Sequence, residues 1–271
     1  MSLRNKKIVV LGSRGMLGQI VKKYFNQKGY DVTCFDDRYT IESRISYISF
    51  LRKLKNAVVI NCIGKIKQKT DDTNDLLFVN TIFPTDLRNV LSDDVIMIHP
   101  STDCVFDGMK GAPYDKNDMS DAYDDYGLSK RLAEVALAGR YNTLITRVSL
   151  IGPDENANGK SLMAWVFSQK NGSSVNGYTN HLWNGITTLE WCKQVETFLL
   201  NNDSFKFQLI QCGTYEHHTK FDMVSMFNEL FQLGLEIKRF ETNTPVDRRL
   251  TPELICKPLS EQLLDLKEYI K

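Results

Sequence analysis

The tyrosine and lysine of Tyr126-Gly-Leu-Ser-Lys130 are the residues of this chain best suited to acid–base chemistry. Side chains four residues apart share one face of a helix. An ammonium group beside a phenol favours the phenolate, so the tyrosine would exchange a proton closer to neutral pH than its ordinary pKa allows. The hydroxyl of Thr102, in Ser101-Thr-Asp103, would polarise a carbonyl oxygen that Tyr126 protonates. The three residues are therefore predicted to act together on a carbonyl group.

The spacing of Tyr126 and Lys130 is not sufficient evidence by itself. Tyr24 and Lys28 repeat the same Tyr-x-x-x-Lys pattern in what is predicted to be the first helix, where no chemistry is expected. The Tyr126–Lys130 copy stands out only because of the other motifs around it.

A glycine-rich segment, Gly12-Ser-Arg-Gly15-Met-Leu-Gly18, follows the first predicted strand and opens the first predicted helix. Glycines there allow a tight turn and a close approach to a pyrophosphate, while the helix N-terminus supplies free N–H groups and a favourable dipole. The Gly-x-x-Gly-x-x-Gly spacing differs from the commonest dinucleotide-binding pattern, and glycines serving only a tight strand–helix joint are the alternative. Its position favours nucleotide binding. With the tyrosine and lysine, the loop predicts a hydride-transfer enzyme.

The end of the second predicted strand, where the adenosine ribose is expected, carries opposed signals. Asp36 favours the free 2′-hydroxyl of NAD, whereas Arg38 favours the 2′-phosphate of NADP, and Arg14 in the glycine loop would add a second cation. Because two arginines bracket the site, NADP(H) is weakly favoured, and use of NAD(H) stays open.

The first half of the chain predicts a parallel sheet covered on both faces, because short β-branched runs alternate with longer helical patterns. The expected strands are 7–11, 31–35, 57–63, 95–99 and 143–149. The expected helices are 15–28, 45–54, 76–91 (with Pro84 as a kink or a start) and 123–138. Asp121, Asp124 and Asp125 are expected to cap the last of these helices. The predicted fold class is α/β, a Rossmann-type doubly wound sheet.

After Gly152 the chain changes character, because polar, turn-rich segments flank a short apolar stretch at 162–167. The α/β pattern resumes with a helix at 188–200 and a strand at 207–212. A helix at 221–233, a strand at 236–240 and a final helix from Leu259 follow. We therefore assign 1–152 and about 181–215 to the dinucleotide-binding domain. The segments at about 153–180 and 216–271 would form a small substrate-binding lobe.

Composition narrows the possible partners of the 271-residue chain. The net charge is +1 with no long basic block, which gives little electrostatic support for a nucleic-acid partner. No apolar run reaches the roughly 18–20 residues of a membrane helix, and no signal-peptide pattern opens the chain, so a cytoplasmic protein is expected. The six cysteines are scattered, which predicts reduced thiols. His217-His218 lack a third ligand nearby, and no metal site is predicted.

The motifs together resemble the extended short-chain dehydrogenase/reductase family, and within it the dTDP-4-dehydrorhamnose reductases. They occur in the family's order over most of the chain: Gly12-Ser-Arg-Gly-Met-Leu-Gly18, Asn61-Cys-Ile-Gly64, Val79-Asn80, Ser101-Thr-Asp-Cys-Val-Phe-Asp-Gly108, Tyr126-Gly-Leu-Ser-Lys130, Arg147-Val-Ser-Leu-Ile-Gly152 and Trp183-Asn-Gly-Ile-Thr187. The resemblance implies that Thr102, Tyr126 and Lys130 form the catalytic triad. It also implies NAD(P)H-dependent reduction of a nucleotide-linked 4-keto-6-deoxy sugar in the synthesis of cell-surface polysaccharide precursors.

The resemblance and the motifs also yield candidate binding residues. Trp183 and Asn184 lie in a turn-rich segment, and the pair Arg248-Arg249 lies in a C-terminal loop where a cation could meet a diphosphate. The cofactor-binding candidates are Gly12, Ser13, Arg14, Gly15, Met16, Leu17, Gly18, Asp36, Arg38, Cys62, Ile63, Gly64, Tyr126 and Lys130. The substrate-binding candidates are Thr102, Asp103, Val105, Trp183, Asn184 and Arg249.

Two departures from the family pattern leave the sugar open. Cys104 stands where the rhamnose enzymes usually have tyrosine, and Asn61-Cys-Ile-Gly64 replaces a more alanine-rich segment. A related 4-keto sugar on dTDP or UDP, including an N-acetylated one, fits equally well. The alternatives in function are an epimerase or dehydratase of the same fold and a non-catalytic NADP-binding regulatory subunit. A monomer and a homodimer both fit the sequence.

Overall fold

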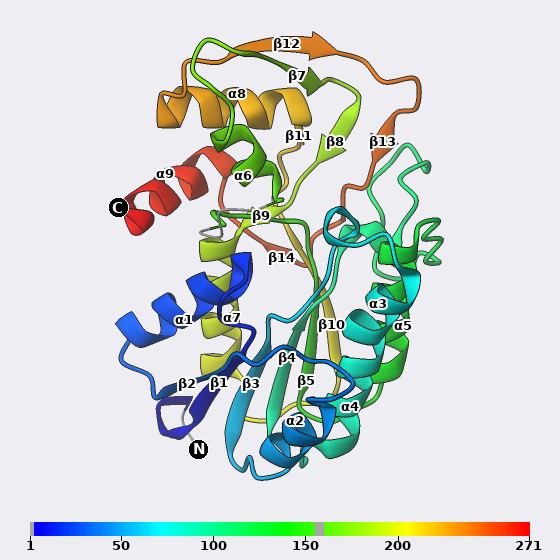
Figure 1. Ribbon diagram of the computed structural model, residues 1–271, viewed down its shortest axis with the longest axis vertical. Coiled ribbons are helices and arrows are strands. Elements are labelled where there is room, and N and C mark those ends of the chain that lie inside the picture. The colour runs from blue at the N-terminus through cyan, green and yellow to red at the C-terminus, as the bar shows by residue number, and fades with distance from the viewer. Residues whose placement is uncertain (1–2, 155–159) are drawn as a thin grey trace.

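The computed structural model describes residues 3–154 and 160–271. Its centre is a seven-stranded sheet in the order β14-β10-β5-β4-β3-β1-β2, in which every neighbouring pair is parallel (Figure 1). The strands are β1 (Lys7–Leu11), β2 (Val32–Phe35), β3 (Ala57–Asn61), β4 (Ile96–Pro100), β5 (Thr143–Arg147), β10 (Gln208–Gly213) and β14 (Leu254–Ile255). The chain adds β2 on one side of β1 and then crosses to add β3 on the other, so the winding direction reverses between β1 and β3.

Helices cover both faces of the large sheet, because its strands are apolar on both faces (Figure 1). Ile8 and Val10 of β1 face one core, whereas Val9 and Leu11 face the other. The first core is closed by α1 (Met16–Gln27), α7 (Thr188–Asn201) and α9 (Leu259–Ile270). The second is closed chiefly by α2 (Arg44–Leu51), α4 (Phe83–Val90) and α5 (Asp125–Leu137), with α3 (Thr73–Leu77) packed beside α5.

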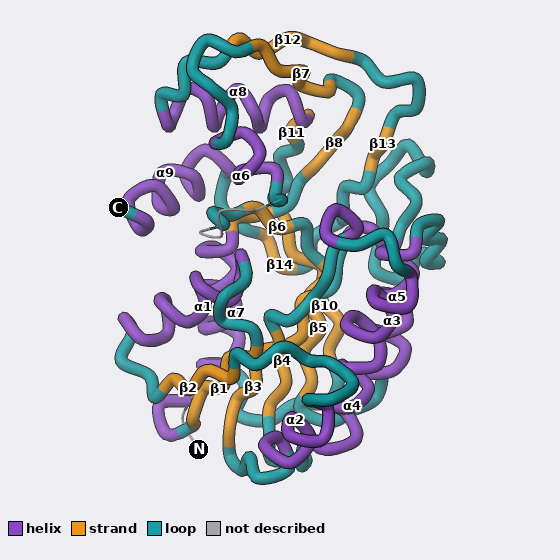
Figure 2. Tube along the Cα trace, viewed as in Figure 1, coloured by secondary structure: helices purple, strands orange, loops and turns teal. Residues whose placement is uncertain are grey.

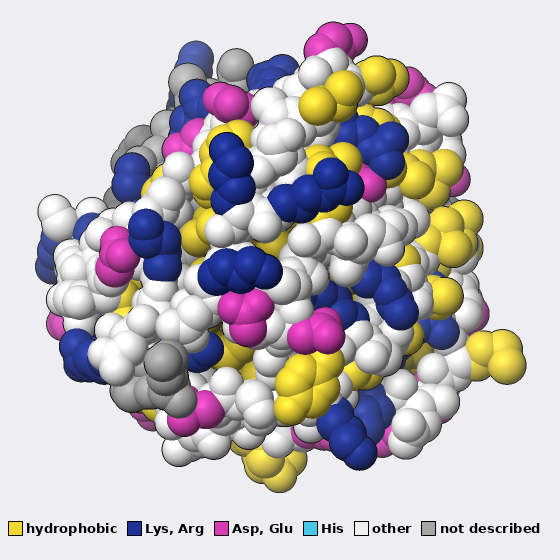
Figure 3. All heavy atoms as spheres, turned by 90° about the horizontal axis from the view of Figure 1, so that it is seen from below, with side chains coloured by type: hydrophobic (Ala, Val, Ile, Leu, Met, Phe, Trp, Pro, Cys, Tyr) yellow, Lys and Arg dark blue, Asp and Glu magenta, His cyan; other side chains and the backbone are white. Residues whose placement is uncertain are grey.

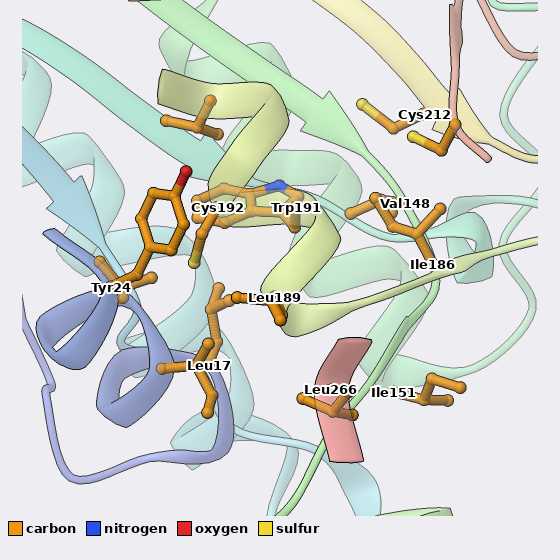
Figure 4. Close-up of a cluster of buried hydrophobic side chains, with 14 of the residues drawn as sticks. Leu17, Tyr24, Val148, Ile151, Ile186, Leu189, Trp191, Cys192, Cys212 and Leu266 are labelled. Carbon is orange, nitrogen blue, oxygen red and sulfur yellow. The ribbon is translucent and has the colours of Figure 1, made fainter. Parts of the chain in front are cut away.

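The core beneath α1 and α7 combines packed apolar side chains with a few satisfied polar groups (Figure 4). Trp191 is fully buried, and its indole Nε1 donates to Thr146 Oγ1 at 2.9 Å. The phenols of Tyr24 and Tyr30 both donate to the carboxylate of Glu196, at 2.6 and 2.7 Å. The Tyr24 and Lys28 pair therefore lies in a structural hydrogen-bond cluster of α1 and α7.

Smaller sheets and two helices lie beyond the carboxyl ends of the large sheet's strands (Figures 1 and 2). β7 (Ser174–Tyr178) pairs with β12 (Glu236–Phe240), and β8 (His181–Trp183) pairs with β11 (His218–Thr219) and β13 (Val246–Asp247). The helices are α6 (Leu162–Phe167) and α8 (Lys220–Phe231), of which α8 begins with a capping box formed by Thr219 and Asp222. β6 (Leu150–Ile151) and β9 (Ile186–Thr187) pair at the junction.

The α/β Rossmann-type class is confirmed, and several local predictions differ in detail. The expected helix 76–91 is divided into α3, a π-helical segment η3 (Phe78–Ile82) and α4, with Pro84 in the first turn of α4. The first turn tolerates proline because its N–H groups lack intrahelical partners. The short 3₁₀ segments η1 (Leu3–Asn5), η2 (Lys67–Lys69) and η4 (Asp103–Val105) were not expected.

The predicted division into a dinucleotide-binding domain and a substrate-binding lobe differs from the observed strand pairing in two places. β8 lies within the stretch assigned to the dinucleotide-binding domain, yet it pairs with strands of the small lobe. β14 and α9 lie within the stretch assigned to the lobe, yet β14 extends the large sheet and α9 packs on α7 and β9. The chain therefore passes between the two parts more often than the composition indicates.

On the face of the molecule seen from below, neither positive nor negative side chains dominate. Basic side chains there are interspersed with acidic and apolar ones (Figure 3). Within residues 3–154 and 160–271, no helix combines the length and apolar character needed to cross a bilayer. In the same ranges no cluster of three or more His, Cys, Asp or Glu side chains could hold a metal ion.

Candidate active site

The glycine loop lies at the carboxyl ends of β1 and β3, where the winding of the sheet reverses and where open α/β sheets bind ligands. Gly12 has a φ of 79°, and a β-carbon there would lie 2.7 Å from Ile63 Cγ1. A β-carbon on Gly18 would lie 2.1 Å from the carbonyl oxygen of Gly12. The two glycines thus allow the loop to close over the end of β3. Gly15, the N-cap of α1, provides no side-chain cap, so the first N–H groups of Met16 and Leu17 face an uncapped helix end.

The carboxylate of Asp36 is bound to the glycine loop. Ser13 donates to it twice, from its backbone N–H to Oδ1 and from its hydroxyl to Oδ2, both at 2.8 Å. The guanidinium of Arg14 donates to the backbone carbonyl of the same aspartate. Arg38 is exposed two residues further on. The structure therefore brings Ser13, Arg14 and Asp36 together, with Arg38 beside them in sequence.

The segment after β3 is held by a buried asparagine. Asn80, in the π-helical η3, accepts from the N–H of Lys65 and donates to its carbonyl, both at 2.8 Å, and also donates to Ser129 Oγ at 3.0 Å. Gly64 packs against the same side chain, where a β-carbon would lie 3.7 Å from Asn80 Oδ1. Asn80 thus fastens the loop containing Cys62, Ile63 and Gly64 to helix α5.

Thr102 follows β4 and begins η4. Its hydroxyl accepts from the N–H of Cys104 at 3.1 Å and donates to Asp103 Oδ1 at 3.1 Å, and its side chain is 5% exposed. The same hydroxyl lies close enough to the Tyr126 phenol to lower its pKa. Thr102 and Tyr126, from separate segments, therefore meet at the carboxyl edge of the sheet.

Helix α5 is positioned by its first turn. Asp124 is the N-cap and accepts from the N–H of Gly127 at 2.8 Å, as the sequence predicts. Asp121 and Asp125 bind elsewhere: the former accepts from Asp107 N at 2.8 Å and the latter from the hydroxyl of Thr73. The helix approaches η4 directly at its first turn, which places Tyr126 against Thr102.

Lys130 is buried, and its amine is bound at the end of β4. Its ammonium nitrogen donates to the carbonyl of Pro100 at 2.6 Å and lies 3.4 Å from His99 Nε2. Burial lowers the pKa of Lys130 to about 8, although the carboxylate of Glu134 opposes this. His99 is buried at the end of β4, and burial together with Lys130 lowers its pKa.

The expectation that Lys130 would lower the pKa of Tyr126 is not met in this structure. Burial raises the pKa of the phenol, and Cys104, Asp103 and Asp124 raise it further, while the hydrogen bond from Thr102 acts against them. The physical reason is the orientation of Lys130, whose amine faces Pro100 and His99. The tyrosine therefore keeps its proton at neutral pH.

A buried ion pair fixes α5 to the sheet behind these residues. Glu134 and Arg147 are bound through both carboxylate oxygens, at 2.9 and 2.8 Å, and their side chains are 1% and 4% exposed. Ser101 donates to the same carboxylate at 2.6 Å. This pair joins β4, β5 and α5, so it holds Thr102 and Tyr126 in register.

Three of the substrate-binding candidates are occupied by structural contacts. Asn184 donates to the carbonyls of Thr214 and Leu250, and accepts from Leu250 N, so its amide is fully used. Val105 is fully buried in a small apolar cluster. Arg249 forms a two-point ion pair with Asp247, at 2.8 and 2.7 Å.

Two cations near Thr102 were missed or not singled out from the sequence. Arg248 donates to the carbonyl of Phe106 at 2.9 Å and lies 3.8 Å from Cys104 Sγ. Lys220, at the start of α8, lies over the Trp183 ring, 6.0 Å from its centroid. Burial lowers the pKa of Lys220, Asp103 and Cys104 oppose that shift, and Arg248 adds to it. The neighbouring Arg248-Arg249 pair was a signal for the first cation, whereas a lone Lys220 carries none.

Trp183 and Asp103 are both neighbours of Lys220. Trp183 is 3% exposed, and its indole N–H is buried without a hydrogen-bond partner among the described residues. Asp103, on η4, lies near Lys220 and Arg248. Burial raises the pKa of the Cys104 thiol to about 12, so the residue that replaces the family's tyrosine stays protonated. The large sheet and the small lobe thus both contribute side chains beside Thr102.

Comparisons with known proteins identify the family of this chain. Residues 6–176 match the family described as RmlD substrate binding domain. A probable low-salt glycan biosynthesis reductase from Haloferax volcanii is 28% identical over 157 residues, which span 52% of this chain and 52% of that protein. The match therefore spans about half of the curated relative's length.

Two solved structures share the fold over nearly the whole chain. A dTDP-4-dehydrorhamnose reductase from Clostridium acetobutylicum has a TM-score of 0.80 at 18% identity, with 97% of this chain and 99% of that chain covered. A dTDP-4-dehydrorhamnose reductase from Bacillus anthracis, solved in complex with NADP, has a TM-score of 0.81 at 15% identity, with 98% of each chain covered. Since the family match extends over more than half of the sequence, the chain belongs to the RmlD substrate binding domain family.

Proposed function

We propose that this protein is a nicotinamide-dependent reductase of a nucleotide-linked 4-keto-6-deoxy sugar. Its role would be in the cytoplasm, in the synthesis of precursors for cell-surface polysaccharide or glycan, as a monomer or homodimer. Family membership and the name of the Haloferax relative support the substrate class and the context. The dinucleotide-binding fold supports the hydride chemistry.

The observation that carries the proposal is a continuous line of contacts along the carboxyl edge of the sheet. Gly12 packs on Ile63 after β3, and the N–H of Ile63 donates to Asn61 Oδ1 at 3.1 Å. Asn61 contacts His99 at the end of β4, and His99 contacts Lys130 on α5. This line connects the glycine loop to Lys130, which supports the proposal that the loop and the three predicted catalytic residues serve one site.

The residues of the loop fit a dinucleotide. A β-carbon on Gly12 or Gly18 would collide with neighbouring protein atoms, so the tight turn requires glycine at both positions. The uncapped N-terminus of α1 offers N–H groups to a pyrophosphate. Gly12, Ser13, Arg14, Gly15, Met16, Leu17 and Gly18 would hold the phosphates, and Cys62, Ile63 and Gly64 would line the site after β3. Tyr126 and Lys130 would meet the nicotinamide ribose.

We favour NADPH over NADH on the geometry of Asp36. Both of its carboxylate oxygens already accept from Ser13, so its charge is engaged inside the loop. Arg14 lies on the same turn, where its guanidinium could meet a 2′-phosphate, and Arg38 follows at the end of β2. The NADP complex of the Bacillus reductase supports the same choice.

The proton chemistry follows from the environment of Tyr126. Its raised pKa keeps the phenol protonated, which suits a group that gives a proton to a carbonyl oxygen. The Thr102 hydroxyl would donate a hydrogen bond to the same oxygen and so stabilise developing negative charge. When bound, the reduced nicotinamide cofactor supplies the hydride for the keto carbon.

The substrate would lie between η4 and the small lobe. Lys220 and Arg248 bring positive charge to this region and would bind the phosphates of a nucleotide sugar, with Trp183 and Asp103 beside them. Arg248 replaces Arg249 as the candidate, because Arg249 is paired with Asp247.

The test is consumption of cofactor by the purified protein with a panel of dTDP- and UDP-linked 4-keto sugars. A reductase oxidises NADPH or NADH continuously, in proportion to the sugar reduced. An epimerase or dehydratase would convert its sugar without net oxidation of added cofactor. Binding of cofactor with no change in any sugar of the panel would support a regulatory subunit and overturn the proposal.

A further inference from the structure

Lys130 belongs to a buried chain of hydrogen bonds in which the chemistry of each group determines which atom donates and which accepts. Asn61, His99 and Lys130 are 0%, 1% and 6% exposed, so all three residues are buried. The chain runs from Ile63 through Asn61 and His99 to the amine of Lys130, and ends at the carbonyl of Pro100. Buried groups of this kind must satisfy one another.

The orientation of Asn61 fixes the tautomer of His99. Asn61 Oδ1 accepts from the N–H of Ile63 at 3.1 Å, so the other atom of the amide is the NH₂ group. That nitrogen lies 3.0 Å from His99 Nδ1 and can only donate to it. Since Nδ1 accepts, the proton of the neutral imidazole is on Nε2.

The tautomer of His99 in turn selects the form of Lys130. The Nε2–H points at the lysine nitrogen, 3.4 Å away, and a neutral amine can accept from it through its lone pair. An ammonium group has no lone pair, and it would place its own protons against the imidazole N–H. The amine still donates to Pro100 at 2.6 Å. Of the two forms, only the neutral amine can both accept from His99 and donate to Pro100.

We propose that Asn61 and His99 are positioning residues that favour the neutral amine of Lys130 in the cofactor-free protein, so that cofactor binding at alkaline pH takes up a proton. A ribose hydroxyl oxygen would accept from the ammonium form once the side chain leaves His99. The proposal rests on the proposed function only for the identity of the ligand.

The other titratable groups around Lys130 do not change this direction. Glu134, one turn along α5, favours the charged form, but its carboxylate is neutralised by Arg147. Tyr126, one turn back on α5, keeps its proton because burial raises its pKa. His99 is the titratable side chain that β4 contributes, and burial keeps it neutral. Burial lowers the pKa of Lys130 to about 8, which favours the neutral amine in the same direction as the hydrogen bond from His99.

The direct test is the number of protons taken up when wild-type protein binds NADPH. Calorimetric titration in two buffers with different heats of ionisation gives that number. About one pH unit above the pKa of Lys130, close to one proton per NADPH is expected, and about one unit below it almost none. Binding of NADPH without proton uptake at the higher pH would overturn the proposal and leave the proposed function intact.

Replacing the donor should shift the equilibrium in a way that a structural defect does not. In His99→Phe the Nε2–H is gone, so the pH of half-maximal uptake should rise by about one unit. NADPH should then bind about fivefold tighter than to wild type at about pH 9, and equally at about pH 7. His217→Phe, on the surface, is the matched control. An unchanged half-uptake pH in folded His99→Phe would contradict the inference.

The tautomer of His99 can be measured directly on the wild-type protein without any ligand. The chain has four histidines, and long-range ¹H–¹⁵N correlations on ¹⁵N-histidine protein show which ring nitrogen carries the proton. His99 should be protonated on Nε2 and bare on Nδ1. A proton on Nδ1 would overturn the proposal. Absence of any NADPH or NADH binding, by contrast, would overturn the proposed function. The tautomer of His99 would still test the hydrogen-bond directions proposed for Asn61, His99 and Lys130.

Discussion

Gly127 and Cys104 are in direct backbone contact: a β-carbon on Gly127 would lie 2.0 Å from the carbonyl oxygen of Cys104. This contact joins α5 to η4, the two segments that carry Tyr126 and Thr102. No side chain separates them, so the distance between the phenol and the hydroxyl is set by backbone packing. Glycine is required here because of space, since its backbone lies in an ordinary helical turn.

Gly127→Ala should therefore push α5 away from η4 and separate Tyr126 from Thr102. A displacement of about 1 Å in a catalytic group costs on the order of a hundredfold in rate. Overpacking should also lower the free energy of unfolding by about 1–3 kcal/mol. Turnover and urea unfolding of the variant check both effects, with Leu128→Ala, an exposed neighbour on α5, as control. Wild-type turnover in Gly127→Ala would show that the contact does not set the geometry.

Tyr126→Phe should abolish proton transfer while leaving cofactor binding almost unchanged. The phenol is proposed to protonate the carbonyl oxygen, a step worth about 10²–10⁴ in rate. Tyr24→Phe is the matched control, because Tyr24 belongs to the other Tyr-x-x-x-Lys pair, with Lys28, and its phenol donates to Glu196 in the core. The control should lose stability and keep turnover. Equal turnover in the two variants would remove Tyr126 from the mechanism.

The contrast between the two tyrosines illustrates what the sequence could predict. The strands, the helices and the glycine loop are visible because their signals are local: apolar runs, helical periods and a fixed spacing of glycines. Thr102 and Tyr126 meet because the carboxyl ends of β4 and the start of α5 lie at one edge of a parallel sheet. That placement follows from the fold class and could be expected from it.

Other features depend on side-chain directions that a single sequence does not carry. Arg248 and Arg249 are adjacent, yet one turns to Cys104 and the other to Asp247, according to the backbone after β13. The amine of Lys130 donates to the carbonyl of Pro100 and lies beside His99, which no spacing in the sequence indicates. The π-helical turn containing Asn80 likewise follows from its contact with α5.

Arg14→Ala should discriminate between the two cofactors. If the guanidinium binds a 2′-phosphate, its loss removes a charged hydrogen bond worth about 1.5–3 kcal/mol, or roughly ten- to a hundredfold in NADPH affinity. NADH affinity should change little. Arg38→Ala, titrated in parallel, measures the second cation. A wild-type protein that binds NADH more tightly, with no effect of either substitution, would show that Asp36 sets the preference.

Lys130→Met should measure how much burying the charged lysine lowers the unfolding free energy of the wild type. Burial lowers its pKa from 10.5 to about 8 in the folded protein. Between these two values the unfolded chain binds a proton that the folded chain does not, so the wild type gains stability as pH rises through this window. A shift of this size corresponds to at most about 3 kcal/mol.

The pH dependence of the difference between the two proteins isolates this contribution. At neutral pH the penalty of burying the charged form is present in the wild type, although Lys130→Met also loses the hydrogen bond to Pro100. From about pH 8 upward, the unfolding free energy of the wild type should rise relative to that of the variant by roughly 2–3 kcal/mol. Lys28→Met, at a half-exposed position, is the control for removing a lysine charge. Urea unfolding at several pH values measures all three proteins, and parallel curves for the wild type and Lys130→Met would show that the amine is charged in the folded state throughout.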